Sequence, residues 1–284
     1  MRPIFRDSRL QALFTHQGYV QVDLLTAADV ATLTDLYDSN AAHMPQSPAS
    51  FTVAMNDMGL RRRISSGIRA VFEPRIAGVL DRCRTIIGNF FHKQPDSPKS
   101  QFRMHQDWYF VDETQHHSLS VWCPMDDVDE VNGTLSVIPG SHRLSQHVRG
   151  YGTGFPFIDL ESIVREKYSR LLPMKAGAAV FFDQRLYHWS GPNGSQTRRL
   201  ATNCFVAPEE AQLVFPHTDP QAHPDRIELF AADEDLYTSF VLGVRPQHAK
   251  SLGLVDAQIP SLSAADLERV LGPHLMRAGA PVDA

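Results

Sequence analysis

The sequence lacks features that define several classes of protein. It has three cysteines in 284 residues, widely spaced and without a Cys-x-x-Cys pair, so the sequence suggests neither a disulfide framework nor a thiolate zinc site. No stretch approaches the roughly 18 consecutive apolar residues that a membrane-spanning helix needs. The amino terminus enters charged residues without an apolar segment, which predicts no cleavable signal. We therefore expect a reducing, cytoplasmic location.

An excess of positive charge is also absent. The chain has 27 basic and 32 acidic side chains, and its net charge is -5. This balance offers no basic surface to a phosphate backbone, so we expect a small-molecule partner rather than a nucleic acid or a membrane. The sequence does not indicate an oligomeric state. Histidine is well represented, with 13 residues, and imidazole is the commonest side chain in metal and proton chemistry near neutral pH.

Apolar residues at helical spacing dominate the part of the chain before residue 88. The sequence predicts a helix at 9–17, a strand at 19–25, a helix capped by Thr26 and Asp29, and a helix over 61–87 in two pieces, interrupted by Pro74. These elements predict a helical amino-terminal support, residues 1–88.

From residue 89 to about 206 the apolar period changes to two. The predicted strands are 89–93, 101–110, 118–123, 133–138, 178–183 and 199–206, with a helical insertion near 160–171. Many short strands at this spacing are typical of a sandwich or jelly roll. We therefore predict a mainly β fold with flanking helices in a single domain, 1–284, in which 207–284 is a covering segment with a short helix at 264–271.

His-x-Asp pairs occur three times, and their surroundings differ. Prolines around His217/Asp219 and His223/Asp225 predict an exposed loop. His105 and Asp107 lie in an alternating segment, where residues i and i+2 of a strand point to one side. In that strand His105, Asp107 and Tyr109 share one face, opposite a face with these four residues: Phe102, Met104, Trp108 and Phe110. The first pair is therefore the candidate metal site.

His188 is the best candidate for a third ligand, because it follows a short buried apolar run, 177–182. Two histidines and one carboxylate are the ligands of mononuclear non-haem Fe(II) sites. Ser190 shares the side of His188, and Arg199 opens the next strand. A dicarboxylate such as 2-oxoglutarate can chelate iron through its keto-acid end and offer its far carboxylate to Arg199 and Ser190. Arg198 is an alternative to Arg199.

Several segments carry a resemblance to a known family: Lys93–Ser97, His105–Trp108, Val121–His142, and His188-x-Ser190 with Arg199 eleven residues past the histidine. Together they resemble the phytanoyl-CoA dioxygenase family of Fe(II)/2-oxoglutarate oxygenases. The Asn132-Gly133 to Pro139-Gly-Ser-His142 stretch is much more specific than His-x-Asp. The resemblance covers residues 85–206 well and says little about 207–284.

This resemblance implies a double-stranded β-helix (jelly roll, cupin-like) core that holds Fe(II) and uses O2 and 2-oxoglutarate. The implied ligands are His105, Asp107 and His188 for iron, and Arg199, Ser190, Trp122 and Asn89 for 2-oxoglutarate. The implied chemistry is decarboxylation of 2-oxoglutarate to succinate with oxidation of a C–H bond of a small metabolite or natural product. Related halogenases replace the carboxylate ligand with a small residue. Asp107 therefore favours hydroxylation, desaturation or ring closure.

Other interpretations of these residues stay open. The same three ligands fit a metal-binding β-helix protein without oxidative activity, or a zinc hydrolase. The arginines 61–63 are read most simply as a solvated helix face, with an anion clamp for the substrate as the alternative. The glycine-rich loop 149–154 lacks a phosphate cradle and is more plausible as a lid. His142 is predicted to be structural, and His116 and His117 to lie on the surface.

Overall fold

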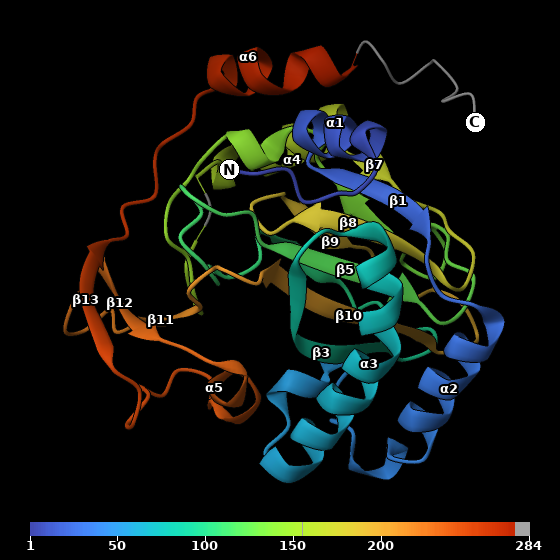
Figure 1. Cartoon of the computed structure of the whole chain (residues 1–284). Helices are drawn as coiled ribbons and strands as arrows, with labels where there is room; N and C mark the ends of the chain where they lie inside the picture. Colours follow the sequence, from blue (N-terminus) through green and yellow to red (C-terminus); the bar gives the residue numbers. More distant parts are fainter. Residues whose placement is uncertain (155, 276–284) are drawn as a thin grey trace.

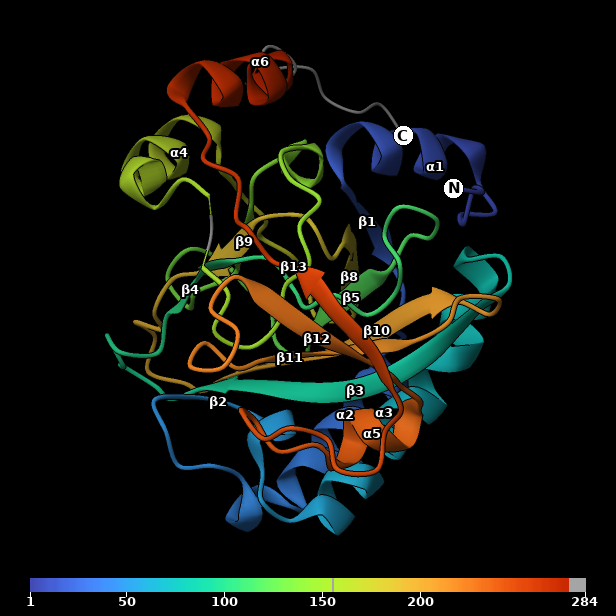
Figure 2. The same cartoon turned by 90° about the vertical axis from the view of Figure 1, so that its left-hand side faces the viewer.

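Two antiparallel β-sheets form the centre of the molecule (Figures 1 and 2). The computed structural model describes residues 1–154 and 156–275. The larger sheet has the order β1 (Tyr19–Asp23), β8 (Ala178–Asp183), β5 (Leu119–Pro124), β10 (Arg199–Pro208), β3 (Cys83–Lys93), β2 (Ala49–Phe51). The smaller sheet has the order β4 (Phe102–His105), β9 (His188–Ser190), β6 (Leu135–Val137), β7 (Arg170–Leu171).

The two sheets pack face to face through their inner side chains. Val180 and Phe182 of β8 lie in one buried cluster with Leu135 and Val137 of β6. Alternate residues of β8 therefore face the smaller sheet, as the period of two predicts, while Ala179 and Phe181 lie in the cluster on the opposite face. This arrangement is the predicted jelly roll, and the prediction of a mainly β fold with flanking helices is confirmed.

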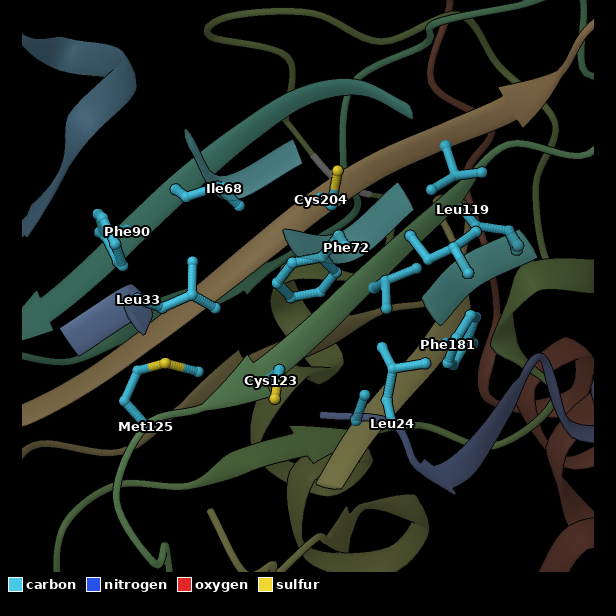
Figure 3. Close-up of a cluster of buried hydrophobic side chains, with 14 of the residues drawn as sticks. Leu24, Leu33, Ile68, Phe72, Phe90, Leu119, Cys123, Met125, Phe181 and Cys204 are labelled. Atoms are coloured by element: carbon cyan, nitrogen blue, oxygen red, sulfur yellow. The ribbon is translucent and has the colours of Figure 1, made fainter. Parts of the chain in front are cut away.

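Helices cover the outer face of the larger sheet. The helices α2 (Ala27–Asp38) and α3 (Met58–Val79) pack there, and Figure 3 shows Leu33 and Phe72 from these helices beside Cys123 and Cys204 of the sheet. The predicted cap of α2 is present, because the Thr26 side chain and Asp29 form a capping box. Within the described residues, no helix is long and apolar enough to cross a lipid bilayer.

The prediction of a helix in two pieces over 61–87 is wrong about the break at Pro74 and about the end of the helix. Pro74 lies inside α3, which continues to Val79. The chain then turns through Arg82, which has φ 45°, and β3 begins at Cys83. Residues 83–87 pair with β10 more than a hundred residues later in the chain, and this pairing sets their extended conformation.

The remaining helices lie around the sheets. They are α1 (Ser8–Gln17), α4 (Glu161–Tyr168), α5 (Glu234–Ser239) and α6 (Ala264–Leu275), with short 3-10 helices at Ala41–His43, Thr52–Ala54, Ser141–Arg143 and Ile158–Leu160. In Figures 1 and 2, α1, α4 and α6 lie at one end of the molecule and α2, α3 and α5 at the other.

The segment after residue 207 contains a third sheet that the sequence did not predict. Its strands are β11 (Val214–Thr218), β12 (Arg226–Ala231) and β13 (Ser251–Asp256). His217 lies in β11 and is 9% exposed, so the prediction of an exposed loop is wrong for this residue. Phe215 and Phe230 of this sheet pack with Tyr237 and Phe240 against Ile87 of β3. This part of the carboxy-terminal segment therefore packs against β3, whereas Leu267 and Leu271 of α6 lie in a separate buried cluster with Ile138.

Candidate metal centre

Three side chains that could hold a metal ion meet between the two sheets. His105 is the last residue of β4, and it pairs with His188, the first residue of β9. The Nε2 atoms of both histidines lie 3.9 Å from Oδ1 of Asp107. The ligand atoms of these three residues lie within 4.8 Å of one another, and the described part of the chain holds no second group of this kind.

Each candidate ligand is oriented by a hydrogen bond on its far atom. Nδ1 of His105 lies 2.7 Å from the Arg103 carbonyl oxygen, and Nδ1 of His188 lies 2.9 Å from that of Leu186. A ring nitrogen that faces a carbonyl carries the proton, so Nε2 keeps its lone pair for a metal. Burial lowers the pKa of His188 to about 4, and its imidazole is therefore neutral at pH 7.

Asp107 lies in the loop that follows β4. The strand predicted over 101–110 is wrong beyond His105, because β4 ends there and its register shifts between Phe102 and His105. Asp107 instead donates its backbone N–H to the Gln184 carbonyl at 3.0 Å, and its carboxylate accepts a hydrogen bond from the Ser120 hydroxyl. The predicted division of faces also fails, since Phe102 lines the same cavity as His105.

A buried ion pair supports this loop. Arg149 donates from Nε to the Asp107 carbonyl at 2.7 Å, and its two terminal nitrogens bond the two Glu113 carboxylate oxygens at 2.8 and 2.6 Å. Both side chains are buried, at 4% and 3% exposure. Arg149 therefore positions a candidate ligand and faces away from solvent. Sequence reasoning missed this role, because neither spacing nor composition pairs residue 113 with residue 149.

A small cavity of about 60 Å³ adjoins the three ligands, and Trp122, Ser190 and Arg199 line it. The Arg199 side chain is 1% exposed, and its Nε and Nη1 have no hydrogen-bond partner in the described chain. Burial lowers the pKa of this guanidinium to about 9, so it stays charged at neutral pH. A buried, unpaired cation needs an anion, and the fork of a guanidinium matches a carboxylate.

Arg198, the alternative to Arg199, has a different environment. Its guanidinium forms an ion pair with Asp38, in which both side chains are more than a third exposed. Arg198 therefore lies outside the small cavity. The structure brings Arg199, and not its neighbour, to the candidate metal centre.

Lys93 is a residue of this site that sequence reasoning missed. It pairs with Arg199 across β3 and β10 and is fully buried. Its Nζ donates to Ser190 Oγ at 2.7 Å, so the hydrogen of that hydroxyl is free for a second acceptor. Burial, with Arg199 nearby, lowers the pKa of Lys93 to about 6. The alternation from Asn89 to Lys93 was the available signal, because it places both on the inner face.

A larger cavity of about 230 Å³ lies on the other side of His105 and Asp107. Apolar and aromatic side chains make most of its wall, including Phe51, Val53, Ile87, Phe110, Phe205 and Phe240. Asn89 also lines this cavity, and it is Asn203, its partner across β3 and β10, that lines the small one. Along the inner face of these two strands, the pairs across β3 and β10 are Lys93 with Arg199, then Asn89 with Asn203, then Ile87 with Phe205. The lining therefore changes from basic through amide to apolar side chains.

Two other predictions, a solvated face for Arg61 and a surface position for His117, are wrong. Arg61 is 3% exposed, so it does not belong to a solvated face; it donates to the Val53 carbonyl at 2.9 Å and lies 4.6 Å from the centre of the Phe240 ring. His117 is partly buried, and its Nδ1 lies 3.3 Å from a carboxylate oxygen of Asp183. Tyr151 in the glycine-rich loop is 52% exposed and lines the larger cavity.

Comparison with known proteins identifies relatives over much of the chain. The family described as phytanoyl-CoA dioxygenase (PhyH) matches residues 16–201. The peroxisomal phytanoyl-CoA dioxygenase of Bos taurus is 33% identical over 124 residues, which are 41% of this chain and 37% of that protein. The ectoine dioxygenase of Streptomyces anulatus is 24% identical over 229 residues, 68% of this chain and 74% of the relative. The chain thus spans well under two thirds of the bovine protein.

Solved structures share the fold. The epimerase SnoN in complex with Fe3+, alpha ketoglutarate and nogalamycin RO has a TM-score of 0.56 at 24% identity, covering 72% of this chain and 85% of its own. EctD from S. alaskensis with 2-oxoglutarate and 5-hydroxyectoine has a TM-score of 0.53 at 22% identity, covering 73% of this chain and 78% of its own. Both likenesses support the jelly-roll architecture.

Proposed function

Because the chain belongs to the phytanoyl-CoA dioxygenase family, we propose that it is an Fe(II)- and 2-oxoglutarate-dependent dioxygenase that oxidises a C–H bond of a small molecule. One observation carries this proposal. A group of two imidazoles and one carboxylate adjoins a cavity that ends in a buried, unpaired guanidinium. The first feature fits Fe(II), and the second fits the far carboxylate of 2-oxoglutarate.

The donor set alone does not separate iron from zinc. A zinc hydrolase uses similar ligands with a bound water and needs no buried cation beside them. Arg199, with the hydroxyl of Ser190 and the ring of Trp122 5.7 Å from its guanidinium, forms a closed end for an anionic co-substrate. This end of the cavity favours the 2-oxoglutarate enzyme.

Different residues would bind the metal and the co-substrate. His105, Asp107 and His188 would hold iron, which supplies the oxidising chemistry when bound. Arg199 and Ser190 would bind the far carboxylate, while Phe91 and Phe102 keep water from the space between the cavities. For hydroxylation the balance is a substrate C–H, 2-oxoglutarate and O2 giving C–OH, succinate and CO2.

We further propose hydroxylation as the main outcome, with desaturation or ring closure as variants. Asp107 supports this choice, because the family resemblance implies a small residue in place of this carboxylate in related halogenases. Relatives bear names that include phytanoyl-CoA dioxygenase, ectoine dioxygenase and a probable hypophosphite dioxygenase, and a solved relative is a carbocyclase. Substrates therefore differ widely within the family.

Two broader expectations also stay proposals. We propose that residues 1–284 act as one domain, because the carboxy-terminal segment contributes Tyr237, Phe240 and Leu242 to the wall of the larger cavity. We propose a cytoplasmic location, because Cys83, Cys123 and Cys204 are all free thiols.

Conversion of 2-oxoglutarate to succinate tests this function. The purified protein is supplied with Fe(II), O2, 2-oxoglutarate and a panel of candidate substrates, and succinate is measured by mass spectrometry. We expect succinate to form only with iron, and its amount to rise when a substrate is present. The Asp107→Ala protein should form no succinate. Metal binding without succinate from any substrate supports the non-oxidative alternative, and zinc-dependent hydrolysis supports a hydrolase.

A further inference from the structure

The larger cavity carries information about the substrate of the proposed reaction. We propose that it takes an uncharged, mainly hydrocarbon molecule of about two fused six-membered rings, with one hydrogen-bond donor directed at Asn89. This inference rests on the proposed function for its claim that the occupant is oxidised. It rests on the cavity alone for its claim about what binds there.

The cavity is placed to hold a substrate beside the candidate ligands. His105 and Asp107 line both cavities, and so do Phe91 and Phe102. The ligands thus stand at the boundary between the two spaces. A molecule in the larger cavity therefore meets the metal centre from the side opposite Arg199.

The wall of the larger cavity excludes a charged occupant. Asp107, a candidate metal ligand, is its one acidic side chain, and no lysine or arginine lines it in the described chain. Arg61 lies behind this wall, where its guanidinium contacts the Phe240 ring and the Val53 carbonyl. Away from Asp107 and the metal that it would hold, a carboxylate or ammonium group would thus lose its water without gaining a charged partner, which is strongly unfavourable.

The volume limits the size of the occupant. An apolar protein cavity of about 150 Å³ holds benzene. The cavity here measures about 230 Å³, roughly half as large again, so two fused rings fit between its walls. Aromatic walls from Phe110, Phe205 and Phe240 suit flat ring faces.

Asn89 supplies the polar contact. The residue is 1% exposed, and its Oδ1 has no hydrogen-bond partner among the described residues. Ile87 and Phe91, two residues away on either side, line the same cavity, so this part of β3 turns one face toward it. A buried amide oxygen without a partner favours an occupant with an O–H or N–H donor.

Isothermal titration calorimetry with three isosteric probes tests the preference for a neutral ring system. The probes are naphthalen-2-ylmethanol, naphthalene-2-carboxylate and naphthalen-2-ylmethylammonium. All three are titrated without oxygen, into the metal-free protein and into the protein with Mn2+ and 2-oxoglutarate. We expect the alcohol to bind in both states. With Mn2+ and 2-oxoglutarate present, we expect the charged probes to bind about 50-fold more weakly or worse, because their charge is desolvated without a partner.

Variants locate the binding. Leu242→Trp places a larger side chain at the half-buried edge of the cavity. It should weaken binding of the alcohol about tenfold or more, because an overfilled site has less room for a ligand. Leu252→Trp, on β13 at a position 48% exposed, is the matched control and should change nothing. Asn89→Leu should weaken binding of the alcohol about fivefold, because one hydrogen bond is lost. Binding of unsubstituted naphthalene, titrated for comparison, should not change.

Three results would overturn the inference: the alcohol does not bind, a charged probe binds as tightly in the presence of Mn2+ and 2-oxoglutarate, or the folded Leu242→Trp protein binds the alcohol like the wild type. Circular dichroism establishes that each variant is folded. The metal-free titration needs no iron chemistry. A protein that binds the alcohol but never forms succinate therefore rejects the proposed function and leaves the cavity preference standing.

Discussion

Arg199 and its neighbour Arg198 differ clearly in environment, since Arg199 is buried with Nε and Nη1 unpartnered within the described residues, and Arg198 is paired at the surface. Arg199→Met should raise the dissociation constant for 2-oxoglutarate about 10- to 150-fold, because hydrogen bonds to a charged group contribute roughly 1.5–3 kcal/mol. Arg198→Met is the matched control, since its guanidinium pairs with Asp38 at the surface. Titration of the anaerobic Fe(II) protein with 2-oxoglutarate measures both. Equal effects of the two substitutions would contradict the assignment.

Lys93 should act through Ser190. Its Nζ donates to Ser190 Oγ and so directs the hydroxyl hydrogen away from itself, toward the cavity. Lys93→Met should weaken 2-oxoglutarate binding about fivefold, the effect of one misdirected hydrogen bond.

A double-mutant cycle separates this role from a general effect of removing a buried amine. If Lys93 orients Ser190, then Ser190→Ala should weaken binding much less in the Lys93→Met protein than in the wild type. Additive losses would show that the two residues act independently.

At the level of residues, the sequence identified most of the candidate site through local spacing. His105, Asp107, His188, Ser190, Trp122 and Arg199 all line the small cavity. Lys93 was missed because its role depends on a partner in another strand. Asn89 was predicted to contact the co-substrate, and it lines the larger cavity; its role as a co-substrate contact stays a prediction.

At the level of elements, strands that local alternation defines were predicted well. The strand β8 has the predicted bounds, 178–183, and β10 begins at the predicted Arg199. Failures occurred where distant contacts decide the conformation. Residues 83–87 fit a helical pattern but pair with β10, and the segment after His105 leaves the ladder because Asp107 bonds to Gln184.

The buried pair of Glu113 and Arg149 holds the loop after β4. Glu113→Gln should lower the free energy of unfolding by about 3–5 kcal/mol, because it leaves a buried guanidinium without its carboxylate. Glu161→Gln is the control, since it removes a partly exposed partner of Arg165 and should cost less than about 1 kcal/mol. Urea denaturation measures both. Similar small losses would mean that the pair does not stabilise this loop.

At the scale of the whole molecule, buried histidines should make stability depend on pH. Burial lowers the pKa of His142 and His147 to about 4, below the value of about 6.5 in an unfolded chain. Between these values the unfolded chain binds more protons, so stability is complete above about pH 6.5 and falls as the pH drops toward 4.

Urea denaturation at pH 7.5 and pH 5 tests this dependence. His147→Leu should reduce the difference between the two pH values, because both ring nitrogens of His147 lack partners among the described residues and leucine adds no titrating group. An unchanged difference would show that other groups cause the acid sensitivity.

The overall architecture was predictable, but the part that shapes the larger cavity was not. Period-two strands and a set of familiar segments indicated the jelly roll. The prolines after residue 215 suggested loops, yet the chain forms the sheet of β11, β12 and β13 and brings Tyr237 and Phe240 to the cavity. Contacts of this kind, between the carboxy-terminal segment and β3, leave no local pattern in the sequence.

The central claim is that 2-oxoglutarate binds iron at His105, Asp107 and His188 with its far end at Arg199. The most direct measurement is the visible spectrum of the anaerobic protein with Fe(II) and 2-oxoglutarate. We predict a weak charge-transfer band in the wild type, its loss in His188→Ala, and its appearance only at higher 2-oxoglutarate in Arg199→Met. A folded wild-type protein without this band would contradict the account.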